Sequence, residues 1–198
     1  GISPENFQIS VDDIYSARRK IPESLLQVMQ VSCDRIKRFH EQQPIPDWQS
    51  TGPGGTLGQR FTPIERVGVY VPGGTAPLPS SLLMSVIPAQ VAGVKEVLVC
   101  TPPVPDQSIL AAASLCGIKY VYQVGGAQAI AAMAYGTETI PKVDKIVGAG
   151  NIFVTLAKQQ VFGFVGLDGL AGPTETMVIA DSSANPEWVA ADLLAQAE

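Results

Sequence analysis

Hydrophobic residues follow two different spacings along this chain, and the change falls close to residue 65. Before that point, apolar positions recur at helical spacing over 10–20 and again over 25–42, which predicts two amphipathic helices. Ser10 together with Asp13 resembles a capping box at the start of the first helix. We therefore expect a helical hairpin, followed by a connection rich in proline and glycine.

After residue 65 the apolar residues come in short continuous runs. Each run is followed by a glycine or proline turn and then by an alanine-rich stretch with helical character. A repeat of about 25 to 30 residues has the size of a βαβ unit, and runs without clean alternation favour strands that are covered on both faces. The four runs are RVGVYV (66–71), EVLVC (96–100), YVYQV (120–124) and DKIVG (144–148).

The pattern predicts an α/β fold whose centre is a doubly wound parallel sheet with helices on both faces. We expect three parts along the chain. Residues 1–65 hold the N-terminal helices and their connection, residues 66–170 form the doubly wound domain, and residues 171–198 begin a second α/β domain.

The last part carries two predicted elements, a strand over 175–181 and a helix that closes the chain. The glycine-rich approach to the strand favours a sheet other than the first. Asn185 is expected to cap the helix and Pro186 to be its first residue. Because no glycine, proline or polar cluster ends this helix, we expect either a helix that frays at a natural terminus or a sequence that is cut within an element.

Composition narrows the class of protein. The chain is 46% hydrophobic and 16% charged, which is enough apolar material for a substantial core, and its net charge of −5 argues against a nucleic-acid partner. No apolar run approaches the roughly 20 residues that a membrane span needs, and no signal-peptide pattern opens the sequence. Three scattered cysteines favour reduced thiols in a cytosol-like compartment.

Residues suited to metal binding or nucleophilic attack are few. His40 is the one histidine; it cannot form a typical zinc site alone, and we expect it on a helix surface. Cys100 ends a predicted buried strand and Cys116 follows an apolar helix, with no histidine nearby in the sequence to activate either thiol. Core packing is therefore expected for both, whereas a cysteine-dependent enzyme would need a thiolate within reach of the ligand site.

Polar side chains adjoin three glycine turns at the carboxyl ends of the predicted strands, where open parallel sheets bind ligands. Tyr70 ends the first strand before PGG, Gln128 follows the GG after the third strand, and Asn151 follows GAG after the fourth. Helix N-termini at these turns suit an anion such as a pyrophosphate. Simpler explanations stay open, because Asn151 could be only an N-cap and Gln128 could bond only to nearby backbone, and no GxGxxG motif is present.

Several long strings of residues resemble the histidinol dehydrogenase family. They are RVGVYVPGGTAPLPSSLLM, VGGAQAIAAMAYGTETIPKVDKIVGAGN, FVTLAKQQV and LDGLAGPTETMVIADSSANPEWVAADLLAQAE. The resemblance runs from about Phe7 to Glu198 and covers an internal fragment, somewhat under half of the family's chain. Members of the family begin with further helices and continue with a second half.

The resemblance implies a zinc-dependent, NAD-linked enzyme that oxidises L-histidinol through histidinal to L-histidine, the last steps of histidine biosynthesis. It also implies two Rossmann-like domains, distantly like those of aldehyde dehydrogenases, in an intertwined homodimer located in the cytoplasm or in a plastid stroma. In that family the tyrosine before PGG, the glutamine of GGAQA and the asparagine of GPGN contact NAD. These residues match Tyr70, Gln128 and Asn151.

The resemblance also assigns residues near the end of the chain. Thr174 matches a substrate-binding serine, and Gln196 matches a glutamine that binds both zinc and substrate. The family's next zinc ligand, a histidine three residues after that glutamine, falls just past Glu198. Its catalytic Glu-His pair and its remaining ligands have no counterpart here, and Ala149 stands where the family usually has proline.

Two functions are therefore compared. The first is a histidinol dehydrogenase fragment that binds NAD but is inactive by itself, because one glutamine cannot hold a catalytic zinc ion and no base is present. The alternative is a stand-alone nucleotide-binding or assembly module without catalysis. An exposed apolar face over the terminal helices would favour the fragment, and a stable monomer would favour the module.

Overall fold

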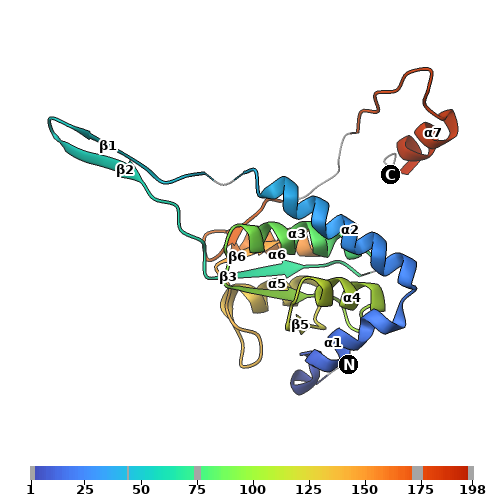
Figure 1. Cartoon of the computed structure of the whole chain (residues 1–198). Helices are drawn as coiled ribbons and strands as arrows, with labels where there is room; N and C mark the ends of the chain where they lie inside the picture. The colour runs from blue at the N-terminus through green and yellow to red at the C-terminus, as the bar shows by residue number, and fades with distance from the viewer. Residues whose placement is uncertain (1–2, 44, 74–76, 171–175, 196–198) are drawn as a thin grey trace.

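A five-stranded parallel sheet forms the centre of the computed structural model, which describes residues 3–43, 45–73, 77–170 and 176–195 (Figure 1). The strand order is β5-β4-β3-β6-β7, and every neighbouring pair is parallel. The chain thus adds β4 and β5 on one side of β3 and then β6 and β7 on the other side, so the strand order reverses between β3 and β6. The strands are β3 (Arg66–Tyr70), β4 (Glu96–Cys100), β5 (Tyr120–Tyr122), β6 (Lys145–Val147) and β7 (Gly166–Leu167).

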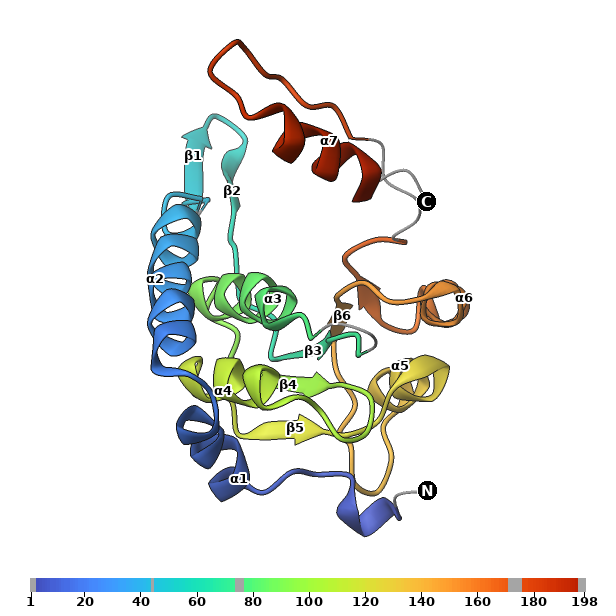
Figure 2. The same cartoon turned by 90° about the vertical axis from the view of Figure 1, so that its right-hand side faces the viewer.

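Helices cover both faces of this sheet, as the sequence pattern predicts (Figure 2). One face carries α3 (Pro79–Val91) and α4 (Gln107–Leu115), with α1 (Val11–Ser16) and α2 (Glu23–His40) packed outside them. The other face carries α5 (Gly126–Tyr135) and α6 (Ile152–Val161). None of the helices in the described ranges is long and apolar enough to cross a membrane.

Alternation along β3 distributes its side chains between the two layers. Val67 and Val69 pack into the cluster that includes α3 and α4, whereas Tyr70 packs into the cluster that includes α5 and α6. Gly68 faces α5 so closely that a Cβ atom on it would lie 2.6 Å from the sulfur of Met133. The absence of a side chain at this one position lets the helix approach the sheet.

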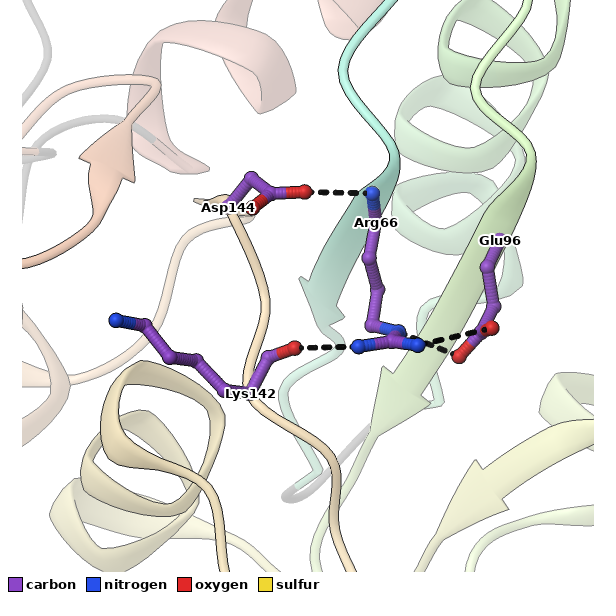
Figure 3. A network of polar contacts seen from close by, with 4 residues as sticks. All are labelled: Arg66, Glu96, Lys142 and Asp144. Carbon is purple, nitrogen blue, oxygen red and sulfur yellow. Dashed lines mark hydrogen bonds and ion pairs between the residues drawn. The ribbon is translucent and has the colours of Figure 1, made fainter.

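The amino ends of the strands are held by a polar network around Arg66 (Figure 3). Its guanidinium group donates to both carboxylate oxygens of Glu96, at 2.6 and 3.2 Å, and to the carbonyl of Lys142 at 2.9 Å. The Arg66 backbone N–H also donates to the carboxylate of Asp144 at 2.8 Å. This network joins β3, β4 and the segment before β6 at the end of the sheet opposite Tyr70.

The N-terminal helices form as predicted. The Ser10 side chain accepts a hydrogen bond from the Asp13 backbone N–H at 3.1 Å and so caps α1. Ile14 and Met29, the buried residues of α1 and α2, belong to the same apolar cluster as α3 and α4. These helices therefore extend the core on one side of the sheet.

The proline- and glycine-rich connection after α2 contains a β-hairpin that the sequence pattern does not indicate. Strand β1 (Trp48–Gly52) pairs antiparallel with β2 (Gly55–Gln59), and all ten of their residues are exposed. The hairpin projects from the sheet domain (Figure 1). Strand prediction relies on alternating buried positions, and this hairpin buries none.

The strand predicted over 175–181 is wrong for the residues that the structure describes. Residues 176–181 form no strand, and the side chains of Met177 and Ile179 are 86% and 92% exposed. A strand needs a neighbour for its backbone groups, and the apolar run has none there. The final helix is confirmed as α7 (Pro186–Ala195), with the Asn185 side chain accepting from the Glu187 N–H at 2.9 Å.

Candidate functional site

A cavity of about 390 Å³ lies at the carboxyl ends of the central strands, next to the point where the strand order reverses. Turns after β3, β4 and β5 and the start of α6 contribute its walls, together with Phe7 from the N-terminal segment. Ligand sites of open α/β sheets occupy this position, because the loops on either side of the reversal point diverge there. We refer to this cavity as the switch-point pocket.

Tyr70 occupies the end of β3 and lines the switch-point pocket. Its side chain is 4% exposed, and its hydroxyl oxygen accepts a hydrogen bond from the Gly126 N–H at 3.0 Å. A phenol oxygen can accept and donate at once, so the hydroxyl hydrogen stays available to a ligand. Tyr70 therefore links the central strand to the first residue of α5.

The start of α5 forms another wall, with Gln128 exposed in its first turn. The residue before the helix is Gly125, which offers no side chain to cap the first N–H groups. The Gly126 N–H is bound by Tyr70, but the N–H groups that follow it have no N-cap side chain, and together with the helix dipole they favour an anionic ligand. Glycine is also required next to the pocket, because a Cβ atom on Gly125 would lie 2.7 Å from the ring of Pro102.

Asn151 precedes α6, and its side-chain oxygen accepts from the Val154 N–H at 3.2 Å. The simpler explanation from the sequence, an N-cap, is thus correct for the oxygen. The same side chain is exposed and lines the switch-point pocket. Its NH2 group remains for an acceptor outside the protein.

The structure brings Tyr70, Gln128 and Asn151 together around one cavity. Their role as cofactor contacts stays a prediction. Thr174 and Gln196, the residues matched to substrate and zinc contacts, lie outside the described part of the chain.

Sequence reasoning missed three residues at or behind this site. Phe7 lines the pocket because its backbone carbonyl accepts from the Gln123 N–H at 2.8 Å, which holds the N-terminal segment against β5. The buried Lys158 forms an ion pair with Asp168, whose side chain is 39% exposed, behind the turn that leads to Asn151. The one available signal was a lysine at an inward position of an otherwise apolar helix face, FVTLAKQQV.

No three His, Cys, Asp or Glu side chains come close enough to hold a metal ion within the described ranges. His40 lies at the end of α2, where its Nδ1 atom is 2.6 Å from the side-chain oxygen of Gln43. It does not line the switch-point pocket. The described residues therefore do not fit a zinc ion.

The cysteine side chains also lie away from the pocket lining. Burial raises the pKa of the Cys100 thiol to about 12. Burial is also the largest cause that raises the pKa of Cys116 to about 12 and that raises the pKa of Cys33. Such thiols are neutral near pH 7 and are poor nucleophiles. The cysteine-dependent mechanism considered from the sequence finds no support in this arrangement.

A second cavity of about 850 Å³ lies on the α3 side of the sheet, between α3 and the connection that follows α2. Residues such as Phe61, Met84 and Val91 give it a mostly apolar wall. Glycine turns and helix N-termini do not contribute to it, so the switch-point pocket is the better match for a phosphate-bearing ligand.

Sheet order, helices on both faces and a glycine-walled pocket at the reversal point define a Rossmann-like α/β protein. The chain belongs to the histidinol dehydrogenase family, whose model matches residues 1–198.

Individual relatives agree with this assignment. The curated histidinol dehydrogenases of Synechococcus sp. and Aquifex aeolicus are 54% and 51% identical to this chain over 202 and 197 residues. Each match covers 100% of this chain and 46% of the relative. The crystal structure of histidinol dehydrogenase from Elizabethkingia anophelis is similar with a TM-score of 0.89 and 47% identity, over 97% of this chain and 46% of that one. The chain thus spans less than half the length of these relatives.

Proposed function

We propose that the switch-point pocket binds NAD+, and that this chain supplies the NAD-binding part of an enzyme that oxidises L-histidinol through histidinal to L-histidine. The main support is that the family resemblance and the position in the fold independently select the same three residues. Tyr70, Gln128 and Asn151 match the family's NAD contacts, and they line one cavity at the reversal point of the sheet. Membership of the histidinol dehydrogenase family gives the substrate class.

Each residue has a distinct part in this proposal. The backbone N–H groups after Gly126 at the start of α5, which no N-cap side chain binds, would hold the pyrophosphate. Gln128 in the first turn would donate from its side-chain amide. The Tyr70 hydroxyl would donate to the cofactor while it keeps accepting from the Gly126 N–H. Bound NAD+ supplies the hydride acceptor for the oxidation of the alcohol.

The zinc and substrate contacts in this proposal are supported by the family resemblance alone. Gln196 would be a zinc ligand and would also contact substrate, and Thr174 would hold L-histidinol through its hydroxyl group. A neutral amide oxygen is a weak zinc ligand without partners. The rest of the zinc site and the general base would come from polypeptide other than this chain, so we infer that the 198 residues alone do not catalyse the reaction.

The chain also carries a surface that argues against a stand-alone module. Trp188 and Leu194 of α7 are 74% and 73% exposed, and Met177 and Ile179 are more exposed still. Large apolar side chains that are exposed along one segment usually contact another protein surface. We infer that 176–194 is covered in the complete enzyme, a cytoplasmic or plastid homodimer in the family.

Calorimetric titration of this chain with NAD+ tests the proposal. We expect saturable binding by the unaltered chain and a loss of about fivefold in affinity for Gln128→Ala, since one hydrogen bond is worth about 1 kcal/mol. Gln159→Ala is the matched control, because Gln159 is an exposed glutamine on α6 that does not line the pocket. Absence of binding, or equal losses for both variants, would overturn the proposed function.

A further inference from the structure

Lys158 is a buried cation that the proposed function does not use. It lies on α6 and its side chain is 2% exposed. The ammonium group donates to the Gly148 carbonyl at 2.9 Å and to the carboxylate of Asp168. Burial of a lysine is costly unless such partners are present, so its position needs a reason.

Asp168 completes the arrangement from the other side. One of its carboxylate oxygens accepts from the Gly148 N–H at 2.7 Å. The other oxygen accepts from Lys158 and also from the Gly169 N–H at 2.8 Å. The ion pair therefore binds both the N–H and the carbonyl group of the same residue, Gly148.

Gly148 begins the short turn that leads from β6 to Asn151. The turn is tightly enclosed, because a Cβ atom on Gly150 would lie 2.7 Å from the side chain of Val154. Lys158 follows Asn151 by about two helical turns, so both residues lie on the same side of α6. The helix that starts at the pocket is thus anchored, through its own lysine, to the turn that precedes it.

We propose that the Lys158–Asp168 pair positions the Asn151 side of the switch-point pocket for NAD+. The pair fixes the turn over 148–150, and the turn sets where Asn151 and the first residues of α6 stand relative to Tyr70. Neither Lys158 nor Asp168 lines the pocket, so both act through Asn151. This inference rests on the proposed NAD+ binding.

A double-mutant cycle separates positioning from general stability. We expect Lys158→Met to weaken NAD+ binding by about tenfold in the unaltered background and by less than about twofold in an Asn151→Ala background. An ion pair that served stability alone would give the same loss in both backgrounds. The readout is the Kd for NAD+ from calorimetry, with each variant checked for folding by circular dichroism.

The control is the Arg66–Glu96 ion pair, which lies at the amino ends of β3 and β4, opposite the strand ends that form the pocket. Arg66→Met removes a cation from β3 without touching the pocket lining, and we expect its Kd to stay within about twofold of the unaltered chain. Asp168→Asn is the second variant, in case Lys158→Met does not fold. It keeps an oxygen for the Gly148 N–H but loses the charge, and we expect a weakening of about threefold.

The outcomes distinguish the two claims. Absence of NAD+ binding by the unaltered chain overturns the proposed function and the inference that rests on it. Binding by the unaltered chain together with an unchanged Kd for Lys158→Met and Asp168→Asn overturns the positioning role alone. Equal losses for Arg66→Met and Lys158→Met, or equal losses in both Asn151 backgrounds, also overturn it.

Discussion

Gly148 lies directly over the backbone carbonyl of Tyr70: a Cβ atom on Gly148 would be 2.1 Å from that oxygen. The φ angle of Gly148 is +109°, a region that residues with side chains rarely adopt. The contact joins the ends of β3 and β6, the two strands between which the sheet order reverses. The geometry of the pocket therefore depends on this residue being glycine.

Replacement of Gly148 by alanine should lower the free energy of unfolding by about 3 kcal/mol or more, because steric overlap and an unfavourable φ angle add together. Gly163 provides the matched control. It has a φ angle of +93°, but a Cβ atom on it would have no other atom within 4 Å, so Gly163→Ala should cost only about 1 kcal/mol. Urea denaturation measures both, and equal losses would show that the Tyr70 contact does not constrain the turn.

Removal of the Tyr70 hydroxyl should affect both stability and binding. In Tyr70→Phe the Gly126 N–H loses its acceptor, which should cost about 1 to 2 kcal/mol of stability and weaken NAD+ binding by about tenfold. Tyr120→Phe is the control, since Tyr120 lies on β5 with a side chain that is 40% exposed. An unchanged Kd for Tyr70→Phe would remove Tyr70 from the binding site.

The cysteines predict a loss of stability in alkali. Because burial raises the pKa of Cys100 from 9.0 to about 12, the unfolded chain releases this proton at a lower pH than the folded chain does. The free energy of unfolding should therefore be unaffected by this thiol below about pH 9 and should fall as the pH rises from 9 towards 12. Cys100→Ala should flatten this part of a stability-against-pH curve.

The same protonation state predicts slow chemical modification. At about pH 8, iodoacetamide should label Cys100 and Cys116 only after the chain is unfolded, as mass spectrometry would report. NAD+ should not change the labelling, because neither thiol lines the pocket. Rapid labelling that NAD+ blocks would instead revive a cysteine-dependent mechanism.

The chain alone should be catalytically silent. With Zn²⁺, NAD+ and L-histidinol present we expect no NADH in a spectrophotometric assay, because no three metal-binding side chains gather within the described ranges. A complete histidinol dehydrogenase is the positive control. Turnover by this polypeptide would contradict the inference that zinc ligands and the base come from elsewhere.

Much of the sheet domain could be predicted because its strands are covered on both faces. β3, β4 and β6 stand out in the sequence as runs of Val and Ile for that reason, and the turns after them follow from glycine. The two-residue strand β7 (Gly166–Leu167) was missed because two residues are too few to show a period. The run over 175–181 has the composition of a strand, but its partner is not supplied by the described residues.

The site could be predicted only in part. Sequence position alone placed Tyr70, Gln128 and Asn151 at the ends of parallel strands, since topology brings such ends together. The Lys158–Asp168 pair could not be found in this way, because both residues bind the backbone of Gly148 and these contacts depend on the three-dimensional structure. Phe7 was missed because it reaches the pocket through backbone hydrogen bonds, which any residue can make.

The most direct test of NAD+ binding at the switch-point pocket is a ¹H–¹⁵N NMR titration of this chain with NAD+. We expect the largest saturable shifts at the amides of Gly126, Gln128 and Asn151. Shifts confined to the larger apolar cavity around Met84, or none at the start of α5, would contradict the account.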